Sequence, residues 1–220
     1  MNIHSIYAVF MAYFRPARIR VLRGRFPQID GSGAILDIGG APGWWKLVEP
    51  KNRDITIVNI DQRQEKNTVA NGFKFKVVDG RSLPFGPASF DLTFSNSVIE
   101  HVGSFEDQRR FASEMLRCGK SIYLQTPNKW FPVEPHMMAL LIHWLPFLVQ
   151  RRLVRWATVW GWVTKPDQAA IDSFVRGIRL MSRNELKEIF PGCEITSEKF
   201  LGLTKSFIVT EMSSPQQEQG

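Results

Sequence analysis

Short apolar runs alternate with polar turns through the middle of the chain. Five such runs occupy residues 34–38, 55–60, 73–78, 90–94 and 121–124. Between the last two, Ser104 and Asp107 form a helix-start signature, and Gly119 follows the last turn of the predicted helix. Short strands that alternate with helices are typical of an α/β fold, in which helices cover both faces of a mostly parallel sheet.

The alternation stops near residue 129 and resumes near residue 182. Five of the seven tryptophans lie between these points, and we predict an inserted helical cap after the fifth strand, over about 129–180. Beyond it the pattern predicts a helix over 185–190 and strands over 193–198 and 206–210. The predicted organisation is a basic helical segment over 1–30, a domain over 31–212 that contains the cap, and a disordered tail over 213–220.

Small and polar residues follow the ends of the predicted strands. The first strand contains Asp37 and runs into a glycine-rich turn that ends at Gly43. Ligands of parallel α/β sheets bind outside the carboxyl ends of the strands, and glycines let a backbone approach a ligand closely. This turn lacks the G-x-G-x-x-G pattern of nicotinamide sites and the Gly-Lys-Ser/Thr of a P-loop, so both sites are disfavoured.

Composition narrows the class of protein and the chemistry of its partners. The chain has 220 residues, of which 44% are hydrophobic and 22% are charged, an ordinary mixture for one globular domain. The net charge of +7 favours anionic partners: nucleic acid, phosphorylated metabolites or lipid heads. Only Cys118 and Cys193 are present, which suits a reducing cytosol.

Targeting signals are weak. The N-terminal apolar stretch precedes its basic residues, which is the reverse of a signal peptide. The longest apolar run, over 137–149, is shorter than the roughly 20 residues of a spanning helix, and it contains Pro146. We therefore predict a cytoplasmic location and keep peripheral contact with the inner membrane face as an open alternative.

Seven segments together resemble one known family. They are LDIGGAPG at 36–43, NID at 59–61, VDG at 78–80, LPF at 83–85, SFD at 89–91, SVIEHV at 97–102 and TPN at 126–128. In this order they are similar to the class I S-adenosylmethionine-dependent methyltransferases, and among these to the type 11 group that includes ubiquinone and menaquinone biosynthesis enzymes. The resemblance covers about residues 34–128 and resumes over 182–210. It implies a Rossmann-like seven-stranded sheet with an antiparallel last strand, and S-adenosylmethionine as the cofactor.

The resemblance also implies cofactor-binding roles. The residues implied to lie near the methionine part of the cofactor are Asp37, Gly39, Gly40, Ala41, Gly43 and, beside the sulfonium, Asn96. Those near the nucleoside are Asp61 at the ribose, Gln62 at the adenine, and Asp79 with Gly80 at the adenine amino group. Ala41 and Pro42 depart from the family pattern and are similar to RNA ribose methyltransferases. The lysines that those enzymes need are absent after the fourth and fifth strands, so nucleic acid is disfavoured as a substrate.

His101 and His136 are the candidate catalytic residues. A hydroxyl acceptor must lose a proton, and imidazole titrates near neutral pH. A structural role stays open for each: hydrogen bonding near the cofactor for His101, and support of the cap for His136. The four histidines lack the paired spacing of zinc ligands, so the sequence predicts no metal site.

The sequence thus predicts methyl transfer to a small-molecule or lipid-linked acceptor, first of all at oxygen, with carbon and nitrogen left open. An RNA methyltransferase and a non-catalytic cofactor-binding protein of the same fold are the alternatives. The Trp-rich cap is interpreted either as a hydrophobic lid or as a bilayer contact, to which Arg151, Arg152 and Arg155 would contribute. The sequence does not predict the oligomeric state.

Overall fold

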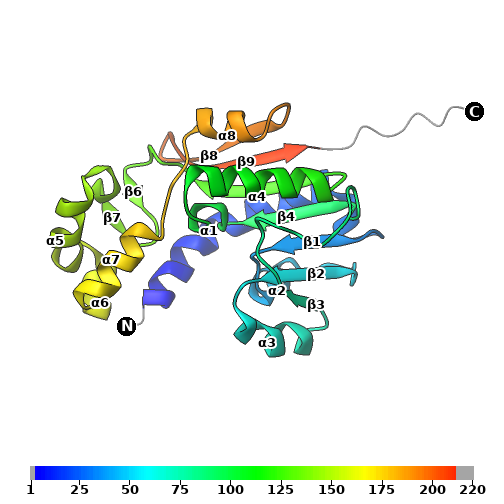
Figure 1. The fold of residues 1–220 in the computed structure, drawn as a ribbon, viewed down its shortest axis with the longest axis horizontal. Coiled ribbons are helices and arrows are strands. Elements are labelled where there is room, and N and C mark those ends of the chain that lie inside the picture. Colours follow the sequence, from blue (N-terminus) through cyan, green and yellow to red (C-terminus); the bar gives the residue numbers. More distant parts are fainter. Residues whose placement is uncertain (1–2, 212–220) are drawn as a thin grey trace, which may run out of the picture.

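The computed structural model describes the backbone of residues 3–211 and the side chains of residues 14–211. A central sheet carries helices on both faces, and a smaller lobe stands beyond one end of its parallel strands (Figure 1). The predicted tail over 213–220 lies outside the described residues.

Seven strands form the sheet, as predicted. They are β1 (Ile35–Ile38), β2 (Ile55–Asn59), β3 (Lys74–Val77), β4 (Leu92–Asn96), β5 (Ile122–Pro127), β8 (Glu194–Phe200) and β9 (Leu203–Glu211). Their order is β3-β2-β1-β4-β5-β9-β8; β1 to β5 are parallel, and β9 is antiparallel to both β5 and β8. Strands β1 and β5 are buried along their whole length, which explains why most of their residues are apolar. The Rossmann-like fold with an antiparallel last strand is confirmed.

Helices cover both faces of this sheet. The elements outside the smaller lobe are α1 (Ile3–Arg25), η1 (Pro27–Ile29), α2 (Pro42–Val48), η2 (Gln62–Gln64), α3 (Glu65–Ala70), η3 (Ile99–His101), α4 (Phe105–Cys118) and α8 (Arg183–Ile189). One face packs on Phe111 and Met115 of α4, and the other on Leu22 of α1 and Trp45 of α2. Helix α4 begins at the predicted capping box, in which Ser104 and Asp107 bond each other's backbone N–H groups.

The smaller lobe is the predicted cap, but it is not wholly helical. It contains the hairpin β6 (Val133–Glu134) and β7 (Ala139–Leu140), then η4 (Ile142–Trp144), α5 (Phe147–Ala157), α6 (Val159–Thr164) and α7 (Gln168–Arg176). The hairpin forms because the buried Glu134 carboxylate accepts the Met137 N–H at 2.5 Å across the turn. Short two-residue strands leave almost no periodic signal, so the sequence pattern did not predict them. The cap packs around a small core of its own, which includes Met137, Val154 and Ile171.

Helix α1 ties the N-terminal segment to the sheet. Arg18 is 1% exposed, and its guanidinium donates to both Glu198 carboxylate oxygens at 2.7 and 2.6 Å and to Gln125 Oε1 at 3.1 Å. The N-terminal half of α1 runs toward α6 of the cap (Figure 1). Among the described residues, no helix combines the length and the apolar character that crossing a bilayer requires.

Candidate active site

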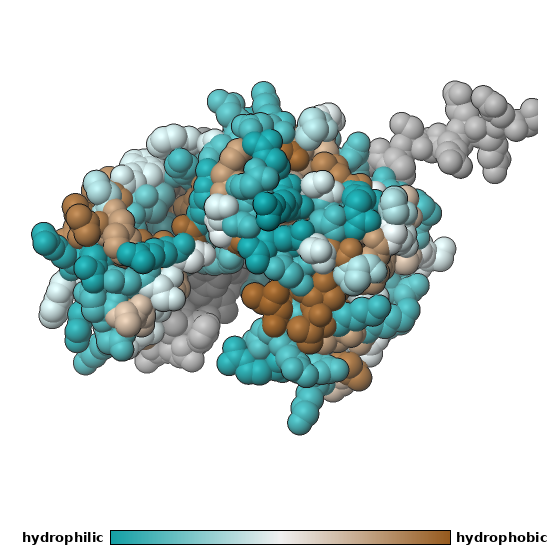
Figure 2. Space-filling view, in the orientation of Figure 1, coloured by the Kyte–Doolittle hydropathy of each residue, from teal (hydrophilic) through white to brown (hydrophobic). Residues whose placement is uncertain are grey.

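A cavity of about 300 Å³ lies at the carboxyl ends of the parallel strands. Its walls come from the segments that follow β1, β2, β3 and β4, where ligands of such sheets bind. The lining residues are Ile38, Gly39, Asn59, Ile60, Val78, Asp79, Gly80, Arg81, Ser97, Val98, His101, Val102 and Phe111. Apolar surface gathers at the hollow beside β2 and β3 (Figure 2). The volume is at the low end of the roughly 300–1,000 Å³ that is usual for small-molecule pockets.

The glycine turn after β1 is held by a neighbouring strand. The Asn59 amide donates to the Gly39 and Gly40 carbonyls at 3.1 and 2.9 Å, and its Oδ1 accepts the Asp61 N–H at 3.0 Å. Gly39 has a φ of +76°, and a Cβ there would come within 2.3 Å of Val98. A side chain at Gly39 would therefore disturb the cavity wall, so the turn needs glycine for packing as well as for conformation.

Asp37 lies beneath this turn and does not line the cavity. It is 1% exposed, its Oδ2 accepts the Trp45 indole N–H at 2.7 Å, and its Oδ1 has no hydrogen-bond partner among the described residues. A Cβ on Gly40 would fall 1.8 Å from the same carboxyl group. Burial raises the pKa of Asp37 to about 7, and the Trp45 hydrogen bond only partly opposes this. Keeping an acid here lowers stability, as is typical of a functional residue.

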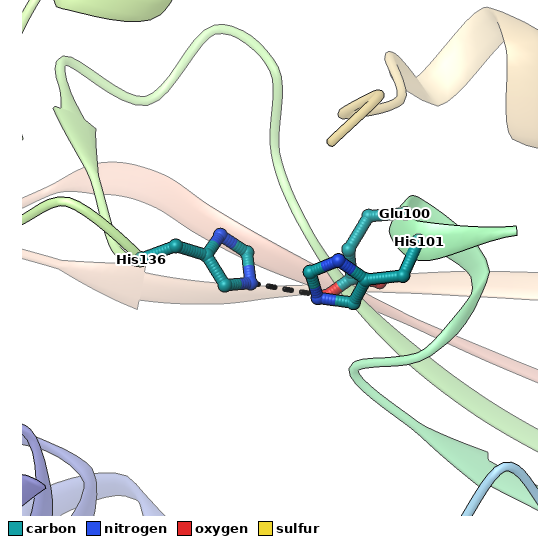
Figure 3. A group of neighbouring side chains, drawn as sticks. All are labelled: Glu100, His101 and His136. Atoms are coloured by element: carbon teal, nitrogen blue, oxygen red, sulfur yellow. Dashed lines mark ion pairs between the residues drawn. The ribbon is translucent and has the colours of Figure 1, made fainter. Parts of the chain in front are cut away.

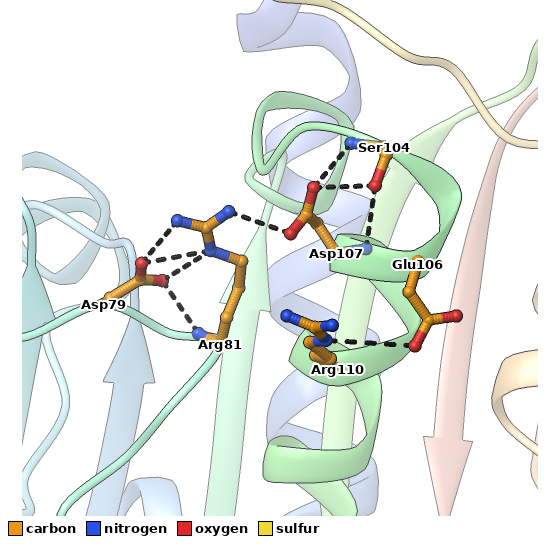
Figure 4. Close-up of polar contacts among 6 residues, drawn as sticks. All are labelled: Asp79, Arg81, Ser104, Glu106, Asp107 and Arg110. Carbon is orange, nitrogen blue, oxygen red and sulfur yellow. Dashed lines mark hydrogen bonds and ion pairs between the residues drawn. The ribbon is translucent and has the colours of Figure 1, made fainter.

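Asp61 and Asp79 follow neighbouring strands and pair with arginines at the surface. Arg63 Nε lies 2.8 Å from Asp61 Oδ1, and Arg81 bridges Asp79 at 2.7 Å and Asp107 at 2.9 Å (Figure 4). These hydrogen bonds hold the pKa of each of the two strand-end carboxyls below its usual range. Exposed ion pairs contribute little to stability, so a ligand can displace either arginine.

The two candidate catalytic histidines meet across the mouth of the cap. Their rings pack edge to face with centroids 4.8 Å apart, and His136 Nδ1 lies 2.7 Å from Glu134 Oε1. Desolvation lowers the pKa of His101, against the opposing charge of Glu100. Burial also acts to lower the pKa of His136, but the bond to Glu134 and the charges of Glu134 and Glu100 outweigh it and raise the pKa.

The fold brings together only part of the predicted site. Gly39, Asp79, Gly80 and His101 line the cavity. The other predicted residues do not line it: Asp37, Gly40, Ala41, Gly43, Asp61, Gln62, Asn96 and His136. Asn96 ends β4 and accepts a 3.5 Å hydrogen bond from Arg18. The cofactor and catalytic roles of all these residues stay predictions.

Sequence reasoning missed several residues of the wall. Ser97 follows β4 with a φ of +56° and donates a hydrogen bond to Gln125 at 2.8 Å. Asn59 lies two residues before Asp61, inside the NID segment, and Arg81 lies two residues after Asp79, directly beyond the VDG segment. Their position next to a strand end could have assigned them to the cavity wall. The last residue of one parallel strand faces the loop that follows the neighbouring strand.

Comparison with known proteins places this edge of the sheet in one family. Residues 36–121 match the family model described as "Methyltransferase domain". This segment, from β1 to the residue before β5, is therefore similar to methyltransferase domains. The ubiquinone-like subtype stays a prediction.

The curated relatives agree over the same region. An uncharacterized methyltransferase of Mycobacterium sp. (strain KMS) is 33% identical over 90 residues, which are 40% of this chain and 34% of the relative. An uncharacterized protein of Mycobacterium tuberculosis (strain ATCC 25618 / H37Rv) is 43% identical over 47 residues, 21% of this chain and 16% of that protein. The match thus spans about a third or less of the length of these relatives.

Solved structures share the fold over most of the chain. An S-adenosylmethionine-dependent methyltransferase from Mesorhizobium loti aligns with a TM-score of 0.55 at 15% identity, over 86% of this chain and 94% of that one. A phosphoethanolamine N-methyltransferase of Haemonchus contortus, solved with S-adenosylhomocysteine, aligns with a TM-score of 0.52 at 14% identity, over 82% and 38%. At these identities the likeness establishes the fold.

The residues at the cavity fit the cofactor of this class. S-adenosylmethionine combines a nucleoside with a sulfonium and an amino acid, so it needs hydrogen-bond acceptors as well as an apolar wall. Asp79 and Asn59 supply acceptors, and Ile60, Val78 and Phe111 supply apolar surface. Beneath the turn, the Asp37 oxygen that has no partner among the described residues is a further buried acceptor, next to Gly40.

Proposed function

We propose that this protein transfers a methyl group from S-adenosylmethionine to an oxygen of an apolar, lipid-linked acceptor. One observation carries the proposal: His101 lines the cavity at the sheet edge and contacts His136 of the cap, which carries most of the exposed large apolar side chains of the described residues. The cofactor supplies an electrophilic methyl group when it is bound. The protein then has to place the acceptor oxygen in line with that methyl group and exclude water.

The acceptor side of the site is formed by the two histidines. His101 lines the cavity and touches the His136 ring, which belongs to the turn of the cap hairpin. An acceptor held between the cavity and the cap would contact His101 first. We therefore propose that His101 and His136 position the acceptor oxygen and receive its proton.

The cap surface supports a membrane-bound acceptor. The exposed large apolar side chains of the cap are Trp130, Leu140, Leu141, Trp144, Leu145, Leu148, Val149, Leu153, Trp156, Trp162 and Val163. Most of the large apolar side chains that the described residues expose are in this segment, and some of the apolar surface is visible on the cap in Figure 2. Large exposed apolar patches mark interaction surfaces.

Basic side chains interleave with this apolar surface. Arg152 and Arg155 are exposed on α5, and neither has a carboxylate partner among the described residues. The Arg155 guanidinium instead lies 5.7 Å from the Trp156 ring centroid. Tryptophan and arginine side by side on an apolar helix are typical of a helix that lies on an anionic bilayer. We propose that the cap rests on such a membrane, at its inner face, and that the acceptor enters from it.

A labelled-methyl assay tests the activity. Purified protein with methyl-labelled S-adenosylmethionine is incubated with cell extract that has been separated into lipid, water-soluble and RNA fractions. We expect label in the lipid fraction, and alkaline hydrolysis of the product then distinguishes an O-methyl ester from an ether. Label in RNA alone would support the nucleic-acid alternative, and cofactor binding without transfer in any fraction would support the non-catalytic alternative.

Vesicle flotation tests the membrane contact separately. Phosphatidylcholine vesicles with phosphatidylglycerol should float the protein, and vesicles of phosphatidylcholine alone should float less of it. The doubly changed variant Leu148→Ser/Trp156→Ser should stay at the bottom of the gradient. Leu201→Ser is the matched control, because Leu201 is an exposed leucine in the turn between β8 and β9 rather than in the cap. Equal flotation of both variants would contradict the proposal.

A further inference from the structure

Three potential metal ligands meet beside the cavity. Glu100 and His101 lie in η3 after β4, and His136 lies in the turn of the cap hairpin (Figure 3). One ligand atom of each residue can be chosen so that all three lie within 4.8 Å of one another. Figure 3 shows the two rings and the Glu100 carboxylate pointing toward a common point. The sequence predicted no metal site, because spacing along the chain does not reveal residues that only the cap brings together.

The Glu100 carboxylate lacks a partner for one of its oxygens. The side chain is fully buried; its Oε2 accepts the Thr126 hydroxyl at 3.0 Å, while Oε1 accepts no hydrogen bond within residues 14–211. The His136 Nε2 atom lies 3.8 Å from this Oε1, too far for a hydrogen bond. A buried carboxylate oxygen that is left unsatisfied is costly, and such a group calls for a bound ion or water.

Glu134 orients His136 as metal sites require. Its Oε1 lies 2.7 Å from His136 Nδ1, while its Oε2 is occupied by the Met137 N–H. When Nδ1 carries the proton, the lone pair of Nε2 faces Glu100. A carboxylate that fixes the outer nitrogen of an imidazole is the usual support of a metal-bound histidine.

The ion pairs near the cluster also favour a cation there. Glu100 and Glu134 are both fully buried, and neither forms an ion pair with a lysine or arginine in the described part of the chain. Their only ion-pair partner there is His136. Two buried carboxylates with a single imidazole leave negative charge that an ion would neutralise.

We propose that Glu100, His101 and His136 bind one divalent transition-metal ion, of which Zn²⁺ is the best match. Two imidazoles and one carboxylate favour Zn²⁺ over the hard cations Mg²⁺ and Ca²⁺, which prefer oxygen ligands. Zinc bonds to nitrogen and oxygen are about 2.0–2.2 Å long, so tetrahedral ligand atoms lie roughly 3.3–3.6 Å apart. Binding therefore needs a movement of about 1 Å, which the exposed His101 ring can make by rotation.

Three protein ligands leave a fourth position on the ion. His101 also lines the cavity, so this position would face it and could take an acceptor oxygen. With the ion bound, this role would replace the direct proton acceptance proposed for the two histidines. It rests on the proposed function, whereas binding of the ion does not.

Calorimetric titration of chelator-treated protein with ZnCl₂ tests the site. We expect one ion per chain, and Glu100→Gln and His101→Ala should each lower the affinity about 10- to 100-fold. Glu100→Gln keeps the shape of the side chain, and His101→Ala removes an exposed ring, so both variants should fold. His143→Gln is the control, because His143 belongs to the cap but bonds to the Lys129 carbonyl at 3.0 Å. No stoichiometric binding, or equal affinity in wild type and His101→Ala, would overturn the proposal.

Cobalt provides a second measurement. Co²⁺ bound through imidazole nitrogen has visible absorption bands, which should be present in the wild type and lost in His136→Ala. Glu134 acts as a positioning residue, so Glu134→Gln should shift these bands and Glu134→Asp should restore them in part. Zinc binding without methyl transfer in any fraction would leave the metal site standing and remove the proposed function. Methyl transfer that persists unchanged after chelation, without stoichiometric zinc binding, would support the proposed function and overturn the metal site.

Discussion

The sheet edge and the cap present two different kinds of surface across one cavity. At the edge, polar residues after β1, β2 and β3 are held by local partners, such as Arg63 for Asp61 and Arg81 for Asp79. The cap exposes tryptophans and leucines that have no cover within the described residues, and its buried Glu134 shares His136 with the buried Glu100 of η3. The edge is built to bind a polar molecule, and the cap is built to meet an apolar one. Such a difference is expected where a fold keeps one site for the methyl donor and varies the site for the acceptor from protein to protein.

The largest effect that separates the two regions is expected at His101, on the border between them. We expect His101→Ala to lower the methyl-transfer rate by about 100-fold or more, because positioned groups that handle a proton contribute about that much. Binding of S-adenosylmethionine, measured by calorimetry, should change less than twofold. Equal losses in transfer and in donor binding would make His101 a part of the donor site and would weaken the contrast between the regions.

The next largest effect concerns the buried acid of the sheet edge. The pKa of Asp37 is raised from 3.8 to about 7 in the folded protein, so the native state retains a proton that the unfolded chain has released. The contribution of Asp37 to the free energy of unfolding therefore falls as pH rises from about 4 to about 7, by about 1.4 kcal/mol per pH unit. Above that range this contribution is constant.

Asp37→Asn should abolish this slope. Urea unfolding at pH 5, 6, 7 and 8 should show the variant gaining stability relative to the wild type up to pH 7. The same variant should bind S-adenosylmethionine less tightly, because it cannot become negatively charged. Parallel pH profiles of the two proteins would show that Asp37 does not titrate in this way.

A smaller effect is expected at the exposed acid of the same edge. Asp61→Ala should weaken binding of S-adenosylmethionine about tenfold, the scale of a lost hydrogen-bonded pair to a ligand. Because Asp61 bonds only to Arg63 and its own turn, the melting temperature without cofactor should stay nearly unchanged. Glu49→Ala, at the end of α2 and outside the cavity, is the control. Unchanged cofactor affinity would remove Asp61 from the site.

The smallest effect is expected on the cap. Arg155→Ala should lower binding to phosphatidylglycerol-containing vesicles about fivefold, since one basic residue near an anionic surface contributes about 1 kcal/mol. Arg53→Ala, an exposed arginine of the sheet domain, should leave vesicle binding unchanged. The difference between the variants should disappear at high salt, which screens the attraction. A loss of the same size in both variants would mean that net charge, rather than the cap, drives binding.

The sequence by itself determined the sheet and the edge at which its parallel strands end. Buried parallel strands are short continuous apolar runs, and the residues after them lie on one edge whatever the rest of the chain does. Asp37, Asp61 and Asp79 could therefore be assigned to that edge from their positions alone. Only the tertiary structure decided that Asp37 lies beneath Gly40 while Asp79 lines the cavity, because strand alternation does not reveal how tightly a turn packs on its own strand.

The cap was decided almost wholly by tertiary contacts. Its two-residue strands are too short to leave a periodic signal, and the meeting of Glu100, His101 and His136 joins segments that are far apart in sequence. Local propensity acts over a few neighbouring residues, whereas a cluster of this kind depends on where the hairpin folds back against η3. The same limit applies to Arg18, whose guanidinium reaches from α1 to Glu198, near the far end of the chain.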